Sequence, residues 1–144
     1  MIVINTDGGA RGNPGPGAIG IVIRRDGRII EKIAARVKGN VTNNVAEYAA
    51  LIRALEIVSQ DYEDKEITCF LDSELIVNQL LGKYRVRNKL LLKLFLRVQE
   101  LQEHFDKIVY QHVKRKDPFQ KIADYLLNQE LDKWLGERKV INKK

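Results

Sequence analysis

Four carboxylates stand at positions where a carboxylate is costly unless it meets a cation. Asp7 follows the apolar run "IVINT", and Asp72 follows the apolar run "TCFL". Glu47 and Asp124 lie in predicted helices, on faces that the 3.6-residue period otherwise fills with apolar side chains. The apolar residues on these faces are Leu51, Ala54, Leu55 and Val58 for Glu47, and Leu127, Leu131 and Leu135 for Asp124. All four acids are therefore expected to point inward.

Each acid also has a structural explanation when it is taken singly. Asp7 and Asp72 could cap turns, and an acid in the first turn of a helix stabilises the helix dipole. Taken together, four inward carboxylates at one end of a sheet would repel one another unless they bind hard divalent cations. A donor set of oxygens without a His or Cys cluster suits Mg²⁺ or Mn²⁺. Two such ions in one site promote phosphodiester hydrolysis.

The elements that must position these acids alternate between strands and helices. Short β-branched runs predict strands, and apolar residues at helical spacing predict helices. Asp26-Gly27 suits a type I′ turn between the second and third strands, and Thr42 with Asn43 suits the start of the first helix. The predicted strands span 1–6, 18–25, 28–39, 66–73 and 107–113, and the predicted helices span 42–60, 73–82, 88–105 and 119–135.

This order predicts an α/β fold with a five-stranded mixed sheet. Sequential strands joined by short turns are antiparallel, whereas a strand that follows a crossover helix is parallel to its predecessor. We expect the strand order 3-2-1-4-5, with strands 1 to 3 antiparallel, strands 4 and 5 parallel to strand 1, and helices on both faces. Asp7 and Asp72 would then meet where ligands of open α/β sheets bind.

Composition bounds the class of protein. The chain has 144 residues, a formal net charge of +6 and one cysteine, Cys69, in the apolar run "ITCFL". We expect one domain over residues 1–135, a basic tail over 136–144, a monomer, and a buried inert thiol. No run is apolar enough to span a membrane, and no secretory signal is evident, so a cytoplasmic location is expected. The positive charge favours a phosphate-bearing partner.

The motifs resemble those of type 1 ribonucleases H. The matching segments are "TDGGARGNPGPGAIGIVI", "TNNVAEYAALIRALE", "LDSELIVNQL" and "KIADYLLNQEL", and they cover nearly the whole chain in this order. The resemblance implies the ribonuclease H-like fold and an endonuclease that cuts the RNA strand of RNA/DNA hybrids with two Mg²⁺ ions, leaving 5′-phosphate and 3′-hydroxyl ends. The implied catalytic acids are Asp7, Glu47, Asp72 and Asp124.

The resemblance also implies residues that contact the substrate. Asn13, Asn43 and Asn44 match positions near RNA 2′-hydroxyls, and Thr42 matches a position near a DNA phosphate. An amide can both donate to and accept from a 2′-hydroxyl, the group that distinguishes RNA from DNA. The same Thr-Asn-Asn run is also a good helix cap, so a structural role is the alternative. Ser73 is a further candidate contact.

Three features depart from the common bacterial pattern. The loop "KRKDPFQK" lacks the histidine that many members carry, and Arg115 or Lys116 is the candidate to handle the leaving phosphate in its place, while His104 and His112 are expected to be structural. The connector "GKYRVRNK" replaces a longer basic handle, and Gln120 replaces the usual Asn. These features favour the compact, handle-less branch, some of whose members also cut double-stranded RNA.

Other functions remain open at this stage. A nuclease acting on DNA would share the metal cluster, and a non-catalytic nucleic-acid binder would share the basic charge. Gly15, Gly17 and Gly20 have the spacing of a dinucleotide-binding fingerprint, but that fingerprint must open a helix and "AIGIVIRR" reads as a strand. We expect the glycines of residues 5–20 to form a tight turn that frames Asp7 and leaves room for a nucleic-acid backbone.

Overall fold

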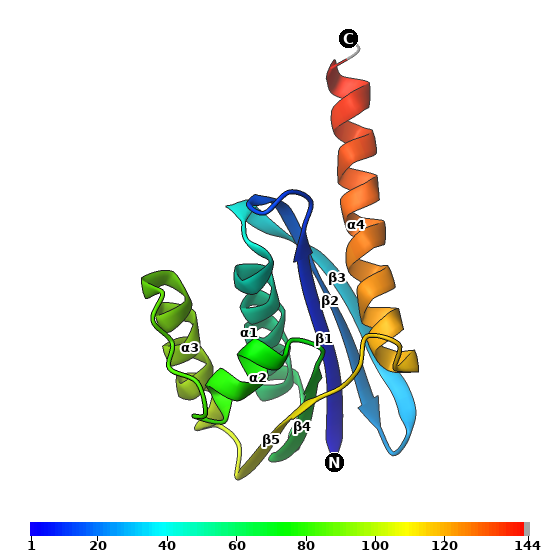
Figure 1. Ribbon diagram of the computed structural model, residues 1–144. Coiled ribbons are helices and arrows are strands. Elements are labelled where there is room, and N and C mark those ends of the chain that lie inside the picture. Colours follow the sequence, from blue (N-terminus) through cyan, green and yellow to red (C-terminus); the bar gives the residue numbers. More distant parts are fainter. Residues whose placement is uncertain (143–144) are drawn as a thin grey trace.

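The computed structural model describes the backbone of residues 1–142 and the side chains of residues 1–137. It consists of one sheet and four helices (Figure 1). In chain order, the elements are β1 (Ile2–Ala10), β2 (Gly15–Arg25), β3 (Arg28–Val41), α1 (Asn43–Asp61), β4 (Glu66–Leu71), α2 (Glu74–Leu80), α3 (Lys89–Gln102), β5 (Lys107–His112) and α4 (Pro118–Asn142).

The sheet has the predicted topology. Its strand order is β3-β2-β1-β4-β5. β1, β2 and β3 pair as antiparallel neighbours, whereas β4 pairs in parallel with β1 and β5 in parallel with β4. Asp26 and Gly27 both have positive φ, as a type I′ hairpin turn requires. The crossover rule and the turn signal together predict this arrangement correctly.

Helices cover both faces of the sheet, as Figure 1 shows, with α1 and α3 on one side and α4 on the other. The main core lies on the α1 side, where Ile2 and Ile4 of β1 pack with Leu51 and Leu55 of α1. A smaller cluster on the α4 side joins Ala18 to Leu127 and Leu131. The free Cys69 is buried in the main core, and burial raises the pKa of its thiol. The predicted inert thiol therefore fits its environment.

Two glycines allow these helices to approach the sheet. A Cβ on Gly8 would lie 2.1 Å from the carbonyl oxygen of Ala46 in α1, and a Cβ on Gly20 would lie 1.9 Å from the carbonyl oxygen of Ala123 in α4. Both distances are far shorter than any real contact. The neighbouring residues Glu47 and Asp124 are thus brought against β1 and β2 by the absence of two side chains.

Several predicted boundaries are wrong. β1 continues through Ala10 and β2 begins at Gly15, so the expected glycine-rich turn of residues 5–20 is mostly strand and only residues 11–14 form bends. Gly8 and Gly20 therefore lie within strands, where they allow α1 and α4 to pack closely against the sheet. The last helix continues through Asn142, past the expected end at residue 135. A single glycine at 136 does not stop a helix when good helix formers follow it.

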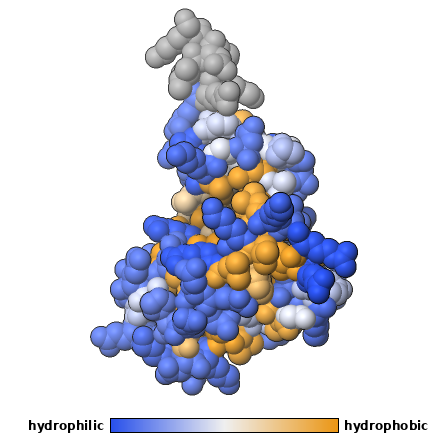
Figure 2. Space-filling model, turned by 90° about the vertical axis from the view of Figure 1, so that its left-hand side faces the viewer, coloured by the Kyte–Doolittle hydropathy of each residue, from blue (hydrophilic) through white to orange (hydrophobic). Residues whose placement is uncertain are grey.

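Within the described part of the chain, the helices are all too short or too polar to span a membrane. Figure 2 views the face on which α3 lies and shows hydrophobic side chains gathered at its centre among hydrophilic ones. Exposed large hydrophobic residues on α3 include Leu90, Leu92 and Leu96.

Candidate active site

Three of the four predicted acids come together at one end of the sheet. Asp7 lies on β1, Glu47 lies on α1, and Asp72 immediately follows β4, the parallel neighbour of β1. Each offers a carboxylate oxygen, and the three oxygens lie within 4.8 Å of one another. Asp7 and Glu47 are buried, and the side chain of Asp72 is only 7% exposed. We call these three residues the acidic cluster.

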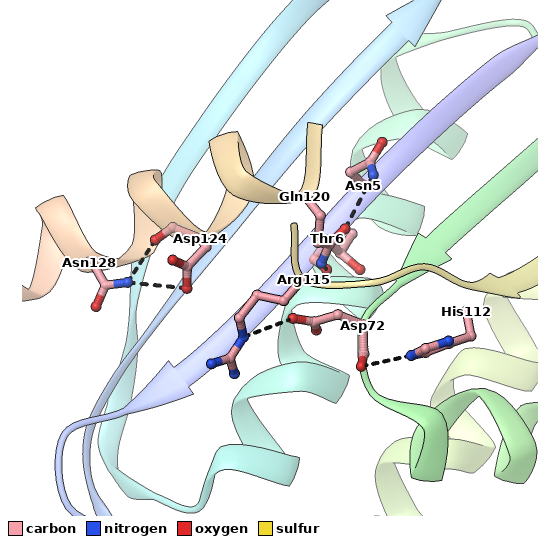
Figure 3. Close-up of polar contacts among 8 residues, drawn as sticks. All are labelled: Asn5, Thr6, Asp72, His112, Arg115, Gln120, Asp124 and Asn128. Carbon is pink, nitrogen blue, oxygen red and sulfur yellow. Dashed lines mark hydrogen bonds and ion pairs between the residues drawn. The ribbon is translucent and has the colours of Figure 1, made fainter. Parts of the chain in front are cut away.

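Asp124 approaches the acidic cluster from the opposite helix layer. It lies in the second turn of α4, and its charge is one of those that raise the pKa of Asp7. The amide of Asn128, one turn later, donates to the Asp124 carboxylate at 3.2 Å and to its backbone carbonyl at 2.9 Å (Figure 3). The structure thus brings Asp124 beside Asp7, although it lies outside the group of three oxygens.

The electrostatics of the acidic cluster favour a cation. Burial, together with the charges of Asp72 and Asp124, raises the pKa of Asp7 to about 7, while a hydrogen bond with Glu47 lowers it. Burial and the charge of Asp7 raise the pKa of Glu47 well above its ordinary value. One carboxylate oxygen of Glu47 is buried without a hydrogen-bond partner. These residues fit a hard divalent ion, which would neutralise the repulsion and fill the unused oxygen.

A buried polar network fixes α4 to β1 beside the acids (Figure 3). The side-chain amide of Gln120 donates to the Thr6 carbonyl at 2.7 Å and accepts from Asn5 at 3.2 Å. Arg24 donates to Asn5 at 3.0 Å and stacks over Phe119 at 3.7 Å from the ring centroid. Gln120 is fully buried. The network connects the residue before Asp7 with the helical turn before Asp124, and sequence reasoning treated Gln120 only as a mild replacement.

Two basic side chains flank Asp72 on opposite sides (Figure 3). Nε of Arg115 lies 3.7 Å from the Asp72 carboxylate, and the Arg115 side chain is 84% exposed. Nε2 of His112 lies 3.2 Å from the backbone carbonyl oxygen of Asp72. Arg115 is therefore exposed beside the acidic cluster, and its action on the leaving phosphate stays a prediction. His112 holds the backbone of Asp72, which agrees with its expected structural role.

Comparison with known proteins shows the family of the chain. Residues 5–129 match the family described as Reverse transcriptase-like. The chain is 39% identical over 127 residues to ribonuclease HI of Halobacterium salinarum, covering 88% of this chain and 62% of the relative. A similar solved structure is that of LC11-RNase H1 in complex with an RNA/DNA hybrid, whose sequence is 41% identical. The two structures superpose with a TM-score of 0.86 over 94% of this chain and 99% of that one. The chain belongs to the ribonuclease HI family.

Some relatives of this chain are longer proteins. A bifunctional protein of Mycobacterium tuberculosis is 37% identical over 132 residues, which cover 91% of this chain but 35% of that protein. The chain thus spans about a third of the mycobacterial relative and less than two thirds of the halobacterial one. The residues that match the family model, 5–129, include all four acids of the site.

Four of the predicted substrate residues line a second pocket, next to the acidic cluster. The side chains of Asn13 and Asn43 accept hydrogen bonds from the backbone amides of Asn43 and Ala10, at 3.0 and 2.9 Å. Thr42 caps α1 by accepting from Val45 at 3.2 Å. Thr42 thus caps α1, as the Thr-Asn-Asn run predicts, and its contact with a DNA phosphate stays a prediction. Because the two asparagines use their oxygens within the protein, each has its amide NH₂ group to offer to a substrate.

The second pocket, which we call the loop pocket, has a volume of about 420 Å³. Its lining includes the four residues Asn13, Thr42, Asn43 and Asn44 together with Asn88, which caps α3. Asn88 was not predicted from the sequence, because it lies in a connector that reads as an ordinary helix start. Asn43 also lines a pocket of about 230 Å³ that contains Asp7, Glu47 and Asp124, which we call the active-site pocket. The two pockets are therefore neighbours.

The remaining predicted contacts stay predictions. Ser73 lies next to Asp72 and caps α2, accepting from the amide of Ile76 at 3.3 Å. Lys116 is exposed in the loop before α4. Four exposed cations, which we call the connector cations, lie from the end of α2 to the first residue of α3: Lys83, Arg85, Arg87 and Lys89. None of the longer insertion found in many bacterial members separates these two helices.

Proposed function

We propose that this protein is an endoribonuclease that hydrolyses the RNA strand of RNA/DNA hybrids to 5′-phosphate and 3′-hydroxyl ends in a metal-dependent reaction. The observation that carries the proposal is the acidic cluster of Asp7, Glu47 and Asp72, with ligand oxygens within 4.8 Å and Asp124 alongside. Family membership and a relative solved in complex with an RNA/DNA hybrid support this choice of substrate.

The chain's own residues suit metal binding and substrate placement. Asp7, Glu47 and Asp72 would hold divalent cations, Mg²⁺ with Mn²⁺ as a substitute, and Asp124 would complete a two-ion site. Such ions, when bound, activate water and stabilise a leaving oxygen. Arg115 would present an exposed cation to a phosphate near Asp72, and the amides of Asn13 and Asn43 would donate to the 2′-hydroxyls that mark the RNA strand.

A substrate panel tests the proposal. The protein is incubated with labelled RNA/DNA hybrid, double-stranded RNA and double-stranded DNA, each with Mg²⁺, with Mn²⁺ and with a chelator. We expect cleavage of the hybrid in its RNA strand, lost with the chelator and with Asp72→Asn. Asp61→Asn, an equal change at the exposed end of α1, is expected to leave cleavage unchanged. Full activity of Asp72→Asn, or cutting of the DNA strand, would contradict the proposal.

Arg115 has a separate test. Arg115→Ala removes the cation that lies 3.7 Å from Asp72 while leaving the buried acids in place. If Arg115 assists departure of the product phosphate, turnover falls about tenfold to a hundredfold, whereas hybrid affinity changes little. Lys121→Ala, an exposed cation on the neighbouring first turn of α4, is the matched control. Unchanged turnover of Arg115→Ala in steady-state kinetics would exclude this role.

A further inference from the structure

A third cavity, which we call the edge pocket, lies where the edge strand β3 passes α4. It has a volume of about 460 Å³ and is lined by Pro16, Gly17, residues 36–40, Leu131 and Trp134. Arg36 and Lys38 supply two cations, and the guanidinium of Arg36 lies 5.7 Å from the centroid of the Trp134 ring. The lining contains no carboxylate. An indole beside two cations is the chemistry with which proteins bind single-stranded nucleic acid.

The edge pocket continues the row formed by the other two pockets. Leu131 lines both the edge pocket and the active-site pocket, and Asn43 lines both the active-site pocket and the loop pocket. The loop pocket is lined by residues at the starts of α1 and α3, and the edge pocket is lined by residues of α4. These helices lie on opposite faces of the sheet (Figure 1). The active-site pocket therefore lies between the loop pocket and the edge pocket, so the strand that is cut there can continue toward the edge pocket.

A duplex cannot use the edge pocket fully. The bases of a hybrid are stacked on one another, so the ring of Trp134 is accessible to a base only where the strand is unpaired. A phosphate of the same nucleotide would lie within reach of the flexible Arg36 and Lys38 side chains. We propose that the edge pocket binds an unpaired nucleotide of the RNA strand at the point where this strand leaves the hybrid. This inference rests on the proposed function.

The single tryptophan of the chain makes the inference directly measurable. The Asp72→Asn protein, which is expected not to cut, is titrated with a blunt hybrid, with hybrids whose RNA strand is extended at the 5′ or the 3′ end, and with hybrids whose DNA strand is extended. Trp134 fluorescence and affinity are recorded together. We expect one of the two RNA extensions to quench the fluorescence and to lower Kd about fivefold to tenfold. The DNA extensions are expected to behave as the blunt hybrid does.

Charge variants provide the control. Arg36→Gln with Lys38→Gln, both on β3 at the edge pocket, is expected to remove the gain from the RNA extension. Arg28→Gln with Lys32→Gln is an equal change on the same strand, at the hairpin end away from the pocket, and is expected to retain the gain. Equal loss in both pairs would show a general effect of charge and overturn the inference.

The remaining outcomes separate this inference from the proposed function. If neither RNA extension alters fluorescence or affinity, or if a DNA extension acts equally, the edge pocket does not bind RNA as proposed. That result leaves cleavage of hybrids by the wild-type protein intact. Failure of the wild type to cut the hybrid would instead contradict the proposed function itself.

Discussion

Asp7 and Glu47 are two buried carboxylates that share a hydrogen bond. Burial, with the charges of Asp72 and Asp124, raises the pKa of Asp7 from 3.8 to about 7. One of the pair can hold a proton at neutral pH when no cation is bound, and the hydrogen bond then joins them. A divalent ion would replace that proton and keep both groups charged. At the scale of the residue, the site therefore suits a cation, and without a cation the two charged carboxylates lower the stability of the folded protein.

This cost predicts a pH dependence of stability. The folded protein holds a proton on Asp7 that the unfolded chain has released, so the free energy of unfolding falls as pH rises from about 4 to about 7. The shift in the pKa of Asp7 corresponds to a decrease of about 4 kcal/mol at most in the free energy of unfolding. Unfolding by denaturant, measured in the presence of a chelator between pH 4 and pH 7, tests this decrease. Asp7→Asn is expected to flatten the dependence, and Mg²⁺ at neutral pH is expected to recover stability.

A matched variant keeps this test specific. Asp61→Asn alters an exposed carboxylate and should retain the full decline. A wild-type protein whose stability in chelator does not fall between pH 4 and 7 would show that the two carboxylates are not strained in the folded state.

Helices and strands position these side chains through unusually close contact. α1 approaches β1 at Gly8, one residue after Asp7, and brings Glu47 with it. α4 approaches β2 at Gly20, which is the register partner of Asp7, and brings Asp124 with it. Gln120 then fixes the first turn of α4 to β1 by hydrogen bonds to Asn5 and Thr6. At the scale of the element, the site depends on two glycines and one buried amide.

Gly20→Ala tests this dependence. The added Cβ would lie 1.9 Å from the Ala123 carbonyl oxygen, so α4 must move away from β2 and carry Asp124 with it. We expect a loss of about 3 kcal/mol in the free energy of unfolding, together with reduced hybrid cleavage. Urea unfolding and the cleavage assay measure the two effects.

Gly136→Ala is the control for that change. Gly136 lies within α4, and a Cβ there would meet nothing within 4 Å. Replacement should therefore raise the free energy of unfolding by about 0.5–1 kcal/mol through helix propensity. If Gly20→Ala unfolds at the urea concentration of the wild type, the helix and the sheet are not in the tight contact described.

Over the whole molecule, a net charge of +6 coexists with an acidic centre. Three of the four connector cations lie between α2 and α3 and the fourth, Lys89, begins α3, while Arg36 and Lys38 lie on β3 at the edge pocket. The centre repels a phosphate backbone until cations bind, whereas the basic segments attract it. We therefore expect the basic segments to attract the nucleic acid to the protein, and the acidic cluster to act on the bound strand.

The salt dependence of hybrid binding measures this attraction. We expect log Kd of the Asp72→Asn protein to rise linearly with log salt concentration. Arg85→Gln with Arg87→Gln should reduce the slope by about one for each phosphate contact that is lost. Arg28→Gln with Lys32→Gln is again the matched pair. An unchanged slope after the connector changes would mean that those cations face solvent, the ordinary role of an exposed basic segment.

The sequence by itself determined the order of elements, the strand order of the sheet and the inward position of the acids. Short stretches of sequence contain the information for these features, because apolar residues repeat every two positions in a strand and every 3.6 positions in a helix. An acid on an apolar face, such as Glu47, is visible in that pattern. The four motif segments carried the family assignment for the same reason, because each is a short continuous run.

Only the tertiary structure decided how distant segments meet. Gln120 and Asn5 are 115 positions apart, and nothing near either residue shows that one receives the other's hydrogen bond. Gly8 and Gly20 read as parts of a turn until the helices that press on them are in place. The edge pocket likewise arises where Arg36 meets Trp134. A local pattern records which side of an element faces inward, but the partner it meets there depends on how the whole chain packs.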